Sequence, residues 1–189
     1  MQQSSETTGA KILIVDDTPA NLDLLRDMLA PSDYQIFFAT GGEQALRIAA
    51  DAAPDIVLLD VMMPGLDGFK TCRRMQADAA LQEIPVIFVT AKTDVEDLAT
   101  GFAAGAVDYI TKPVKQPEVL ARVRTHLQIR SLIRQQRENL AALEQAKQEL
   151  ESLVETKDKF MSNLGREISA AAGRLSEAGA MDEAGNTLR

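Results

Sequence analysis

Short, unbroken runs of apolar residues, each followed directly by polar residues, recur in the first two thirds of the chain. They are Ile12–Val15 before Asp16 and Asp17, Ile56–Leu59 before Asp60, and Val86–Val89 before Thr90. A fourth segment, Val107–Ile110, contains Asp108 and precedes Thr111 and Lys112. Runs of this length without polar interruption are typical of strands buried on both faces of a parallel sheet. The carboxyl ends of such strands lie along one edge, so we expect the polar residues to converge there.

Segments with helical spacing of apolar residues alternate with these runs. The spacing and the turn residues predict strands at Lys11–Asp17, Gln35–Ala39, after Pro54, after Pro85 and at Val107–Ile110, and helices from Thr18 to Pro31, at Glu43–Ala52, at Phe69–Ala77, from Thr93 to Gly105 and from about Pro117 to Ile168. Thr93 and Glu96 have the spacing of a capping box. Five alternations of strand and helix predict an α/β fold with a doubly wound parallel sheet.

The last predicted helix has roughly 50 residues, far more than the mean of about 11–12. Its apolar residues follow alternating steps of three and four, which is the a/d pattern of a coiled coil. We call the following positions the seam: Ile133, Gln136, Leu140, Leu143, Lys147, Leu150, Val154, Lys157, Met161, Leu164 and Ile168. A lone helix would leave this seam in water, so a second helix must cover it. The predicted organisation is a disordered N-terminal tail (1–10), an α/β domain (11–130), a coiled-coil dimerisation helix (131–170) and a frayed or disordered tail (171–189).

Composition narrows the class of protein further. Hydrophobic residues make up 46% of the chain and aromatic residues only 4%, which predicts an aliphatic core. The net charge of −8 and the pI near 4.7 argue against a nucleic-acid-binding surface. We expect a cytoplasmic protein, since the N-terminus lacks an apolar signal core and no apolar run is long enough to span a membrane.

The residues predicted to converge have a definite chemistry. Three carboxylates, Asp16, Asp17 and Asp60, repel one another and call for a cation, and oxygen ligands with room for water suit Mg²⁺. One carboxylate beside a bound cation can accept a phosphoryl group, whose charge Lys112 and the Thr90 hydroxyl would help to neutralise. Taken one at a time, Asp17 could be a helix cap, Thr90 a strand-end hydroxyl bonded to backbone, and Lys112 an ordinary surface lysine.

The stretch from Lys11 to about Arg130 resembles the receiver domain of response regulators in two-component signalling. The matching segments are Ile12–Asp17, Leu58–Gly68, Phe88–Ala91 and Gly105–Pro113. The resemblance implies a flavodoxin-like sheet of strand order 2-1-3-4-5 and a histidine kinase or phosphotransfer protein as the phosphoryl donor.

The resemblance also implies a role for each site residue. Asp60 would be the phosphoacceptor, and Asp17, Asp60 and the backbone carbonyl of Met62 would ligate Mg²⁺, with Asp16 acting mainly through water. Lys112 would pair with the carboxylate or phosphate. Thr90 and Ala91 would belong to the phosphate-binding switch, in which Thr90 would move toward the phosphoryl group and Tyr109 would follow it inward. The Lys112–Pro113 peptide bond would be cis.

A second, shorter resemblance lies in Lys157–Ile168, which is similar to the phosphoacceptor helix of histidine kinases. In that motif a Phe, here Phe160, is followed six residues later by His, but this chain has Arg166 at that position. Arginine cannot accept the phosphoryl group as imidazole does. The only histidine, His126, lies outside the motif, so we expect a packing or surface role for it. The segment resembles a dimerisation helix without its histidine, and the alternative is that it simply continues the coiled coil.

These observations predict a phosphorylation-controlled parallel homodimer, not an enzyme with its own substrate, and with neither nucleic acid nor membrane as partner. Phosphorylation at Asp60 would change receiver packing and coiled-coil geometry. One alternative is a Mg²⁺-dependent phosphatase of the haloacid-dehalogenase type, which needs a second Asp at the position of Met62. The other is a constitutive coiled-coil scaffold, in which Asp60 would have no regulatory effect, or a truncated hybrid kinase.

Overall fold

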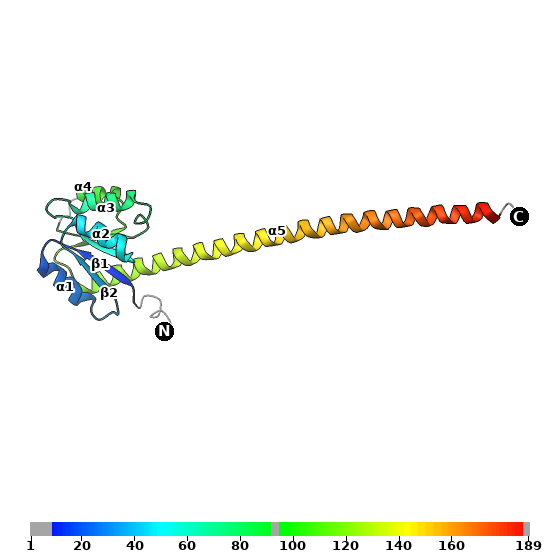
Figure 1. Cartoon of the computed structure of the whole chain (residues 1–189). Coiled ribbons are helices and arrows are strands. Elements are labelled where there is room, and N and C mark those ends of the chain that lie inside the picture. The colour runs from blue at the N-terminus through cyan, green and yellow to red at the C-terminus, as the bar shows by residue number, and fades with distance from the viewer. Residues whose placement is uncertain (1–8, 92–94, 187–189) are drawn as a thin grey trace. The chain divides into compact units, whose positions relative to one another are not determined.

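The computed structural model describes residues 9–91 and 95–186 (Figure 1). Its elements follow one another in the order β1 (Lys11–Val15), α1 (Pro19–Leu29), β2 (Gln35–Ala39), α2 (Gly42–Ala52), β3 (Ile56–Asp60), α3 (Gly68–Ala77), β4 (Val86–Thr90), α4 (Val95–Ala103), β5 (Asp108–Thr111) and α5 (Gln116–Asn186). The predicted alternation of strand and helix is therefore confirmed. The capping box proposed at Thr93 lies outside the described residues.

The five strands form one parallel sheet in the order β2-β1-β3-β4-β5, as predicted. Two registers place the candidate site: Val15 of β1 pairs with Leu59 of β3, and Asp60 pairs with Val89 of β4. Because all strands run in the same direction, the residues that follow β1, β3, β4 and β5 reach the same edge of the sheet.

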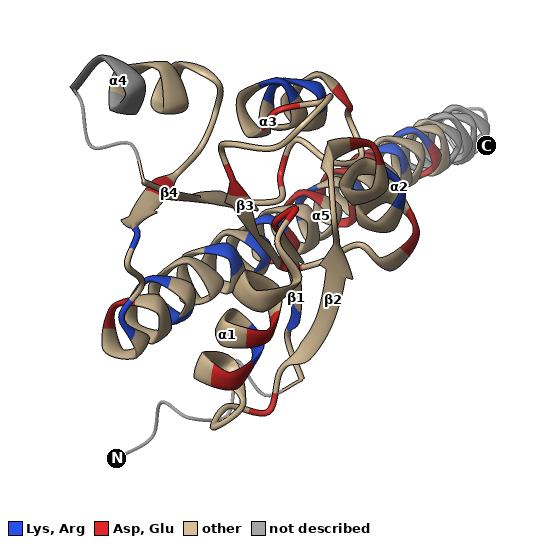
Figure 2. Ribbon diagram, turned by 90° about the vertical axis from the view of Figure 1, so that its left-hand side faces the viewer, with Lys and Arg blue, Asp and Glu red and all other residues tan. Residues whose placement is uncertain are grey.

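Both faces of the sheet are covered by helices, which is why the strands are apolar without alternation. On one face Leu13, Leu59 and Phe88 pack with residues of α2 and α3 such as Ala45 and Met75. Residues one position along each strand face the other way. On that second face Ile12, Ile14, Ile56, Leu58, Ile87 and Val89 pack with Leu22, Leu25 and Leu29 of α1 and with Val119, Val123 and Leu127 of α5. In Figure 2 the strands are mostly tan, and most of the charged residues lie on helices and loops.

The chain divides into two units, Met1–Gln135 and Gln136–Arg189. We call the first the receiver unit, after the resemblance of its sequence, and the second the helical unit. Helix α5 continues to Asn186, beyond Ala170 where the sequence predicted fraying. The prediction relied on apolar periodicity, which ends near Ile168, but the alanines that follow have high helix propensity and need no apolar face. No helix in residues 9–91 and 95–186 is both long and apolar enough to cross a membrane.

Candidate functional site

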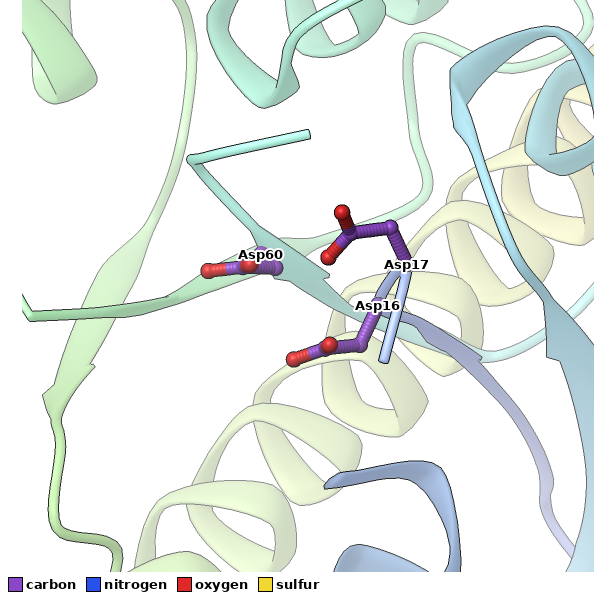
Figure 3. A group of neighbouring side chains, drawn as sticks. All are labelled: Asp16, Asp17 and Asp60. Atoms are coloured by element: carbon purple, nitrogen blue, oxygen red, sulfur yellow. The ribbon is translucent and has the colours of Figure 1, made fainter. Parts of the chain in front are cut away.

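Three carboxylates meet at the carboxyl edge of the sheet (Figure 3). Asp16 and Asp17 directly follow β1, and Asp60 is the last residue of the neighbouring strand β3. One oxygen from each of the three side chains lies within 4.8 Å of the other two. Asp16 and Asp60 are buried, with 1% and 4% of their surface exposed, whereas Asp17 is exposed. The sequence pattern predicted this convergence, and the register of β1 with β3 explains it.

Lys112 directly follows β5, the strand on the far side of β4, and joins this cluster. Its Nζ lies 2.9 Å from Oδ2 of Asp16 and 3.1 Å from Oδ1 of Asp60. The Lys112 backbone N–H donates to the carbonyl of Thr90 at 2.8 Å, and the Lys112–Pro113 peptide bond is cis, as the resemblance implied. The ammonium thus bridges two carboxylates that come from different strands.

The charged groups in this cluster shift one another's pKa values. Burial raises the pKa of the Asp60 carboxyl, and the nearby charge of Asp16 adds to this, while Lys112 opposes it. Burial alone would lower the pKa of Lys112, but its hydrogen bond to Asp16 and the charge of Asp60 raise it overall. Lys112 therefore stays protonated, and a single ammonium faces three carboxylates, so the site retains a negative charge that favours a further cation.

The contacts of Asp16 differ from those of the other two carboxylates. Its Oδ1 accepts a hydrogen bond from the backbone N–H of Thr18 at 2.9 Å, and the side-chain amide of Asn21 donates to both Asp16 oxygens at 2.9 and 3.0 Å. Sequence reasoning missed Asn21. The available signal was its position in the first turn of α1, five residues after Asp16, where a helix that starts at Pro19 turns side chains back toward its own N-terminus.

The loop after Asp60 is held close to the strand by glycine. A Cβ on Gly68 would lie 2.2 Å from the backbone oxygen of Asp60, so no other residue fits without a shift. The Asp67 side chain accepts from the Lys70 backbone N–H at 2.7 Å and caps α3. The loop forms an open pocket beside Asp17, lined by Val61, Met62, Met63, Pro64, Asp67 and Phe69. The Met62 side chain is 60% exposed at this rim.

The remaining predicted residues lie at the ends of β4 and β5. Thr90 is buried, is the last residue of β4 and pairs with Thr111 of β5, one position beyond the residue that pairs with Asp60. Ala91 follows it and is exposed. Tyr109 is half-buried in β5, where its ring packs edge-on to Phe102 with centroids 6.2 Å apart.

The donor set fits a small, hard cation. Carboxylate oxygens from three residues, one of them open to solvent, match the preference of Mg²⁺ for oxygen ligands and retained waters. Receiver domains in general bind Mg²⁺ at an acidic cluster of this kind.

Residues 12–124 match the sequence profile of the response regulator receiver domain, and the chain belongs to this family. It is 41% identical over 134 residues to response regulator PleD of Caulobacter vibrioides, covering 71% of this chain and 30% of that protein. It is 39% identical over 122 residues to the DNA-binding response regulator MtrA of Mycolicibacterium smegmatis, covering 65% of this chain and 52% of that protein.

A solved structure extends the comparison to the fold. The signal receiver domain of a signal transduction histidine kinase from Syntrophus aciditrophicus superimposes with a TM-score of 0.60 and 34% identity, covering 64% of this chain and 91% of that one. The chain thus matches nearly all of an isolated receiver domain but spans only about 30% to 52% of the two curated relatives. Family membership favours the receiver interpretation over the phosphatase alternative.

Proposed function

We propose that Asp60 accepts a phosphoryl group from a histidine kinase or a phosphotransfer protein. Three features of Asp60 support this proposal. It lies at the carboxyl edge of the sheet, it is 3.1 Å from the Lys112 ammonium, and burial raises its pKa while Lys112 opposes this rise, so that the ammonium favours the ionised, nucleophilic form. The contact between Asp60 and Lys112 is the single observation on which the proposal mainly depends.

In the proposed transfer, an oxygen of the Asp60 carboxylate forms a bond to phosphorus. The bond from phosphorus to the donor imidazole nitrogen breaks, and the imidazole leaves with a proton. Lys112 offsets the charge on the phosphoryl oxygens, and Thr90 provides a hydroxyl at the end of β4. Ala91, the next residue, belongs to the same proposed phosphate-binding switch. Asp17, Asp60 and the Met62 carbonyl would hold Mg²⁺, with Asp16 acting through water; the bound metal supplies further charge neutralisation.

A small phosphoryl donor tests this step without a partner protein. Incubation with acetyl phosphate and Mg²⁺ should add one phosphoryl group to the chain, detected as an increase in intact mass. The Asp60→Asn variant should lose this modification, because an amide is not a nucleophile here. Asp51→Asn is the matched control, since Asp51 is an exposed carboxylate on α2 and its variant should be modified normally. Phosphorylation of Asp60→Asn to the wild-type level would contradict the proposal.

We further propose that the chain forms a parallel homodimer through the seam of α5. All eight apolar seam residues are between 40% and 67% exposed in the single chain: Ile133, Leu140, Leu143, Leu150, Val154, Met161, Leu164 and Ile168. Exposed apolar residues at a/d spacing over five heptads are stabilised when a second helix covers them. A second copy of this chain offers the same seam, and parallel pairing would place both receiver units at one end.

A connected set of contacts between β5 and α5 supports the idea that phosphorylation alters this dimer. Arg122 of α5 lies 2.6 Å from Asp108 of β5, and its guanidinium lies 5.6 Å from the centre of the Tyr109 ring. His126, also on α5, is 3.1 Å from the other Asp108 oxygen. An inward movement of Tyr109 would therefore break a contact with the helix that leads into the seam.

Distances between two labelled helices test this coupling. With Cys72→Ala as background, a spin label at Gln148→Cys, outside the seam, reports the separation of paired helices. We expect beryllofluoride with Mg²⁺ to change either the dimer dissociation constant or this distance, and to change neither in Asp60→Asn. If both quantities stay constant in the wild-type background, the coiled coil is a constitutive scaffold.

A further inference from the structure

Among the described residues, Asn21 is the one neutral side chain that donates to the buried Asp16 carboxylate. Its amide nitrogen lies 2.9 Å from Oδ1 and 3.0 Å from Oδ2 of Asp16. The other two donors each contact one oxygen: the Thr18 backbone N–H reaches Oδ1, and the Lys112 ammonium reaches Oδ2. Asn21 therefore contacts both oxygens at once and, together with these two donors, restricts the rotation of the carboxylate plane.

The rotation of this plane matters because Asp16 and Asp60 share Lys112. The ammonium is 2.9 Å from Asp16 Oδ2 and 3.1 Å from Asp60 Oδ1, so its position depends on where Oδ2 points. A backbone N–H bound to one oxygen still permits rotation of the other oxygen about that contact. The second contact from Asn21 restricts this rotation. A metal site needs such fixed orientation when its ligands come from three separate positions.

We propose that Asn21 is a positioning residue for the acidic cluster. By holding both oxygens of Asp16, it keeps Oδ2 on Lys112 and leaves Asp17 and Asp60 oriented for Mg²⁺. This inference rests on the proposed function, because it assumes that the cluster binds Mg²⁺.

Asparagine suits this role at position 21 better than side chains of similar size do. Aspartate at position 21 has the same shape but would place a fourth carboxylate about 3 Å from Asp16, where like charges repel. Leucine would leave Asp16 with two donors and add apolar surface at a polar site. An amide donates without adding charge, so the net charge that attracts the cation is unchanged.

The Asn21→Ala variant tests the inference. The unphosphorylated protein is titrated with Mg²⁺, and ¹H–¹⁵N chemical shifts measured during the titration give the dissociation constant. We expect the dissociation constant for Mg²⁺ to rise about tenfold, the lower end of what loss of a ligand-orienting contact costs. Asp23→Ala is the matched control, since Asp23 is exposed on the same helix and pairs with Arg26, and its variant should bind Mg²⁺ as the wild type does. The same spectra report whether each variant is folded.

A second variant separates the amide from general packing. Asn21→Gln keeps the donor on a longer side chain and should retain most of the affinity that Asn21→Ala loses. Equal losses in the two variants, with native spectra, would overturn the role of the amide.

A double-mutant cycle with Asp16 then shows whether Asn21 acts through that carboxylate. If it does, Asn21→Ala should have less than a twofold effect on the Mg²⁺ dissociation constant once Asp16→Ala is present. An undiminished effect in that background would overturn the inference. If Asp16→Ala and Asp60→Asn both leave Mg²⁺ binding unchanged, the proposed function fails as well; if they weaken it and Asn21→Ala does not, only this inference fails.

Discussion

The receiver unit and the helical unit differ in the exposure of their apolar side chains. In the receiver unit, Leu58 and Ile87 are fully buried between sheet and helices. In the helical unit, Leu143 and Leu153 are 67% and 69% exposed. Both units are comparably regular in backbone structure, so regular structure alone does not mean that a unit has satisfied its apolar surface. The receiver unit closes its own core, whereas the helical unit leaves apolar side chains exposed, and these are the side chains that the proposed dimer would cover.

The largest expected effect separates the two units by a matched pair of leucines. Leu58→Ala should lower the free energy of unfolding of the receiver unit by about 2–5 kcal/mol, because it leaves a cavity under a fully packed sheet. Leu143→Ala removes the same atoms from an exposed position and should leave that free energy unchanged while weakening self-association. Urea unfolding of the receiver unit, together with sedimentation, measures both. Equal destabilisation by the two variants would contradict the distinction between the units.

A pair of glycines gives a second, smaller contrast. Gly68→Ala should destabilise the receiver unit by about 1–3 kcal/mol, because the new Cβ would meet the Asp60 backbone and the loop must shift. It should also slow phosphorylation by acetyl phosphate. A Cβ on Gly165 would have no other atom within 4 Å. Because Gly165→Ala also replaces a glycine within a helix, it should stabilise α5 by about 0.5–1 kcal/mol. Thermal unfolding followed by circular dichroism measures both changes, and a stable Gly68→Ala would show that the close approach is relaxed.

A pair of lysines tests which face of the helical unit is covered. Lys147 is a seam position and Lys159 is not, although both are exposed and pair with a glutamate one turn away. Lys147→Leu should strengthen self-association by about 1.5–3 kcal/mol for each chain of the dimer, as expected for burying one leucine side chain per chain. Lys159→Leu should have no such effect. Sedimentation equilibrium gives both dissociation constants, and an equal gain in the two variants would contradict the assigned seam.

The smallest expected effect concerns pH and the contact between β5 and α5. Burial would raise the pKa of Asp108, but its hydrogen bonds with Arg122, the Tyr109 backbone and His126 lower it below the usual value. A carboxyl whose pKa is lower in the folded state adds stability that is complete above the unfolded pKa of about 3.9 and is lost as pH falls through the folded pKa.

Asp108→Asn should therefore lower the free energy of unfolding at pH 7 by less than about 1 kcal/mol, because the ion pair is partly exposed. The difference from wild type should shrink as pH falls below 4. Urea unfolding at pH 7 and pH 3 gives the two values. A difference that does not depend on pH would show that the Asp108 charge does not contribute.

The sequence predicted much of the site because parallel strands impose a simple rule. A carboxylate after Ile12–Val15 and another after Ile56–Leu59 must lie side by side once the two strands pair, and Lys112 reaches the same edge after the last strand. Asn21 and the Asp108–Arg122–His126 contacts follow no such rule. They depend on how α1 and α5 are rotated against the sheet, which local patterns do not specify.

By itself the sequence determined the alternation of strand and helix, the edge at which the acidic residues gather, and the a/d spacing of the long helix. These follow from the two-residue period of strands and the 3.6-residue period of helices, which are properties of the local backbone. The tertiary structure decided which donors orient Asp16, that Lys112 bridges two carboxylates, and that Arg122 connects Tyr109 with α5. Such contacts join residues that are far apart in the chain or on separate elements, so they arise only when the helices are packed on the sheet.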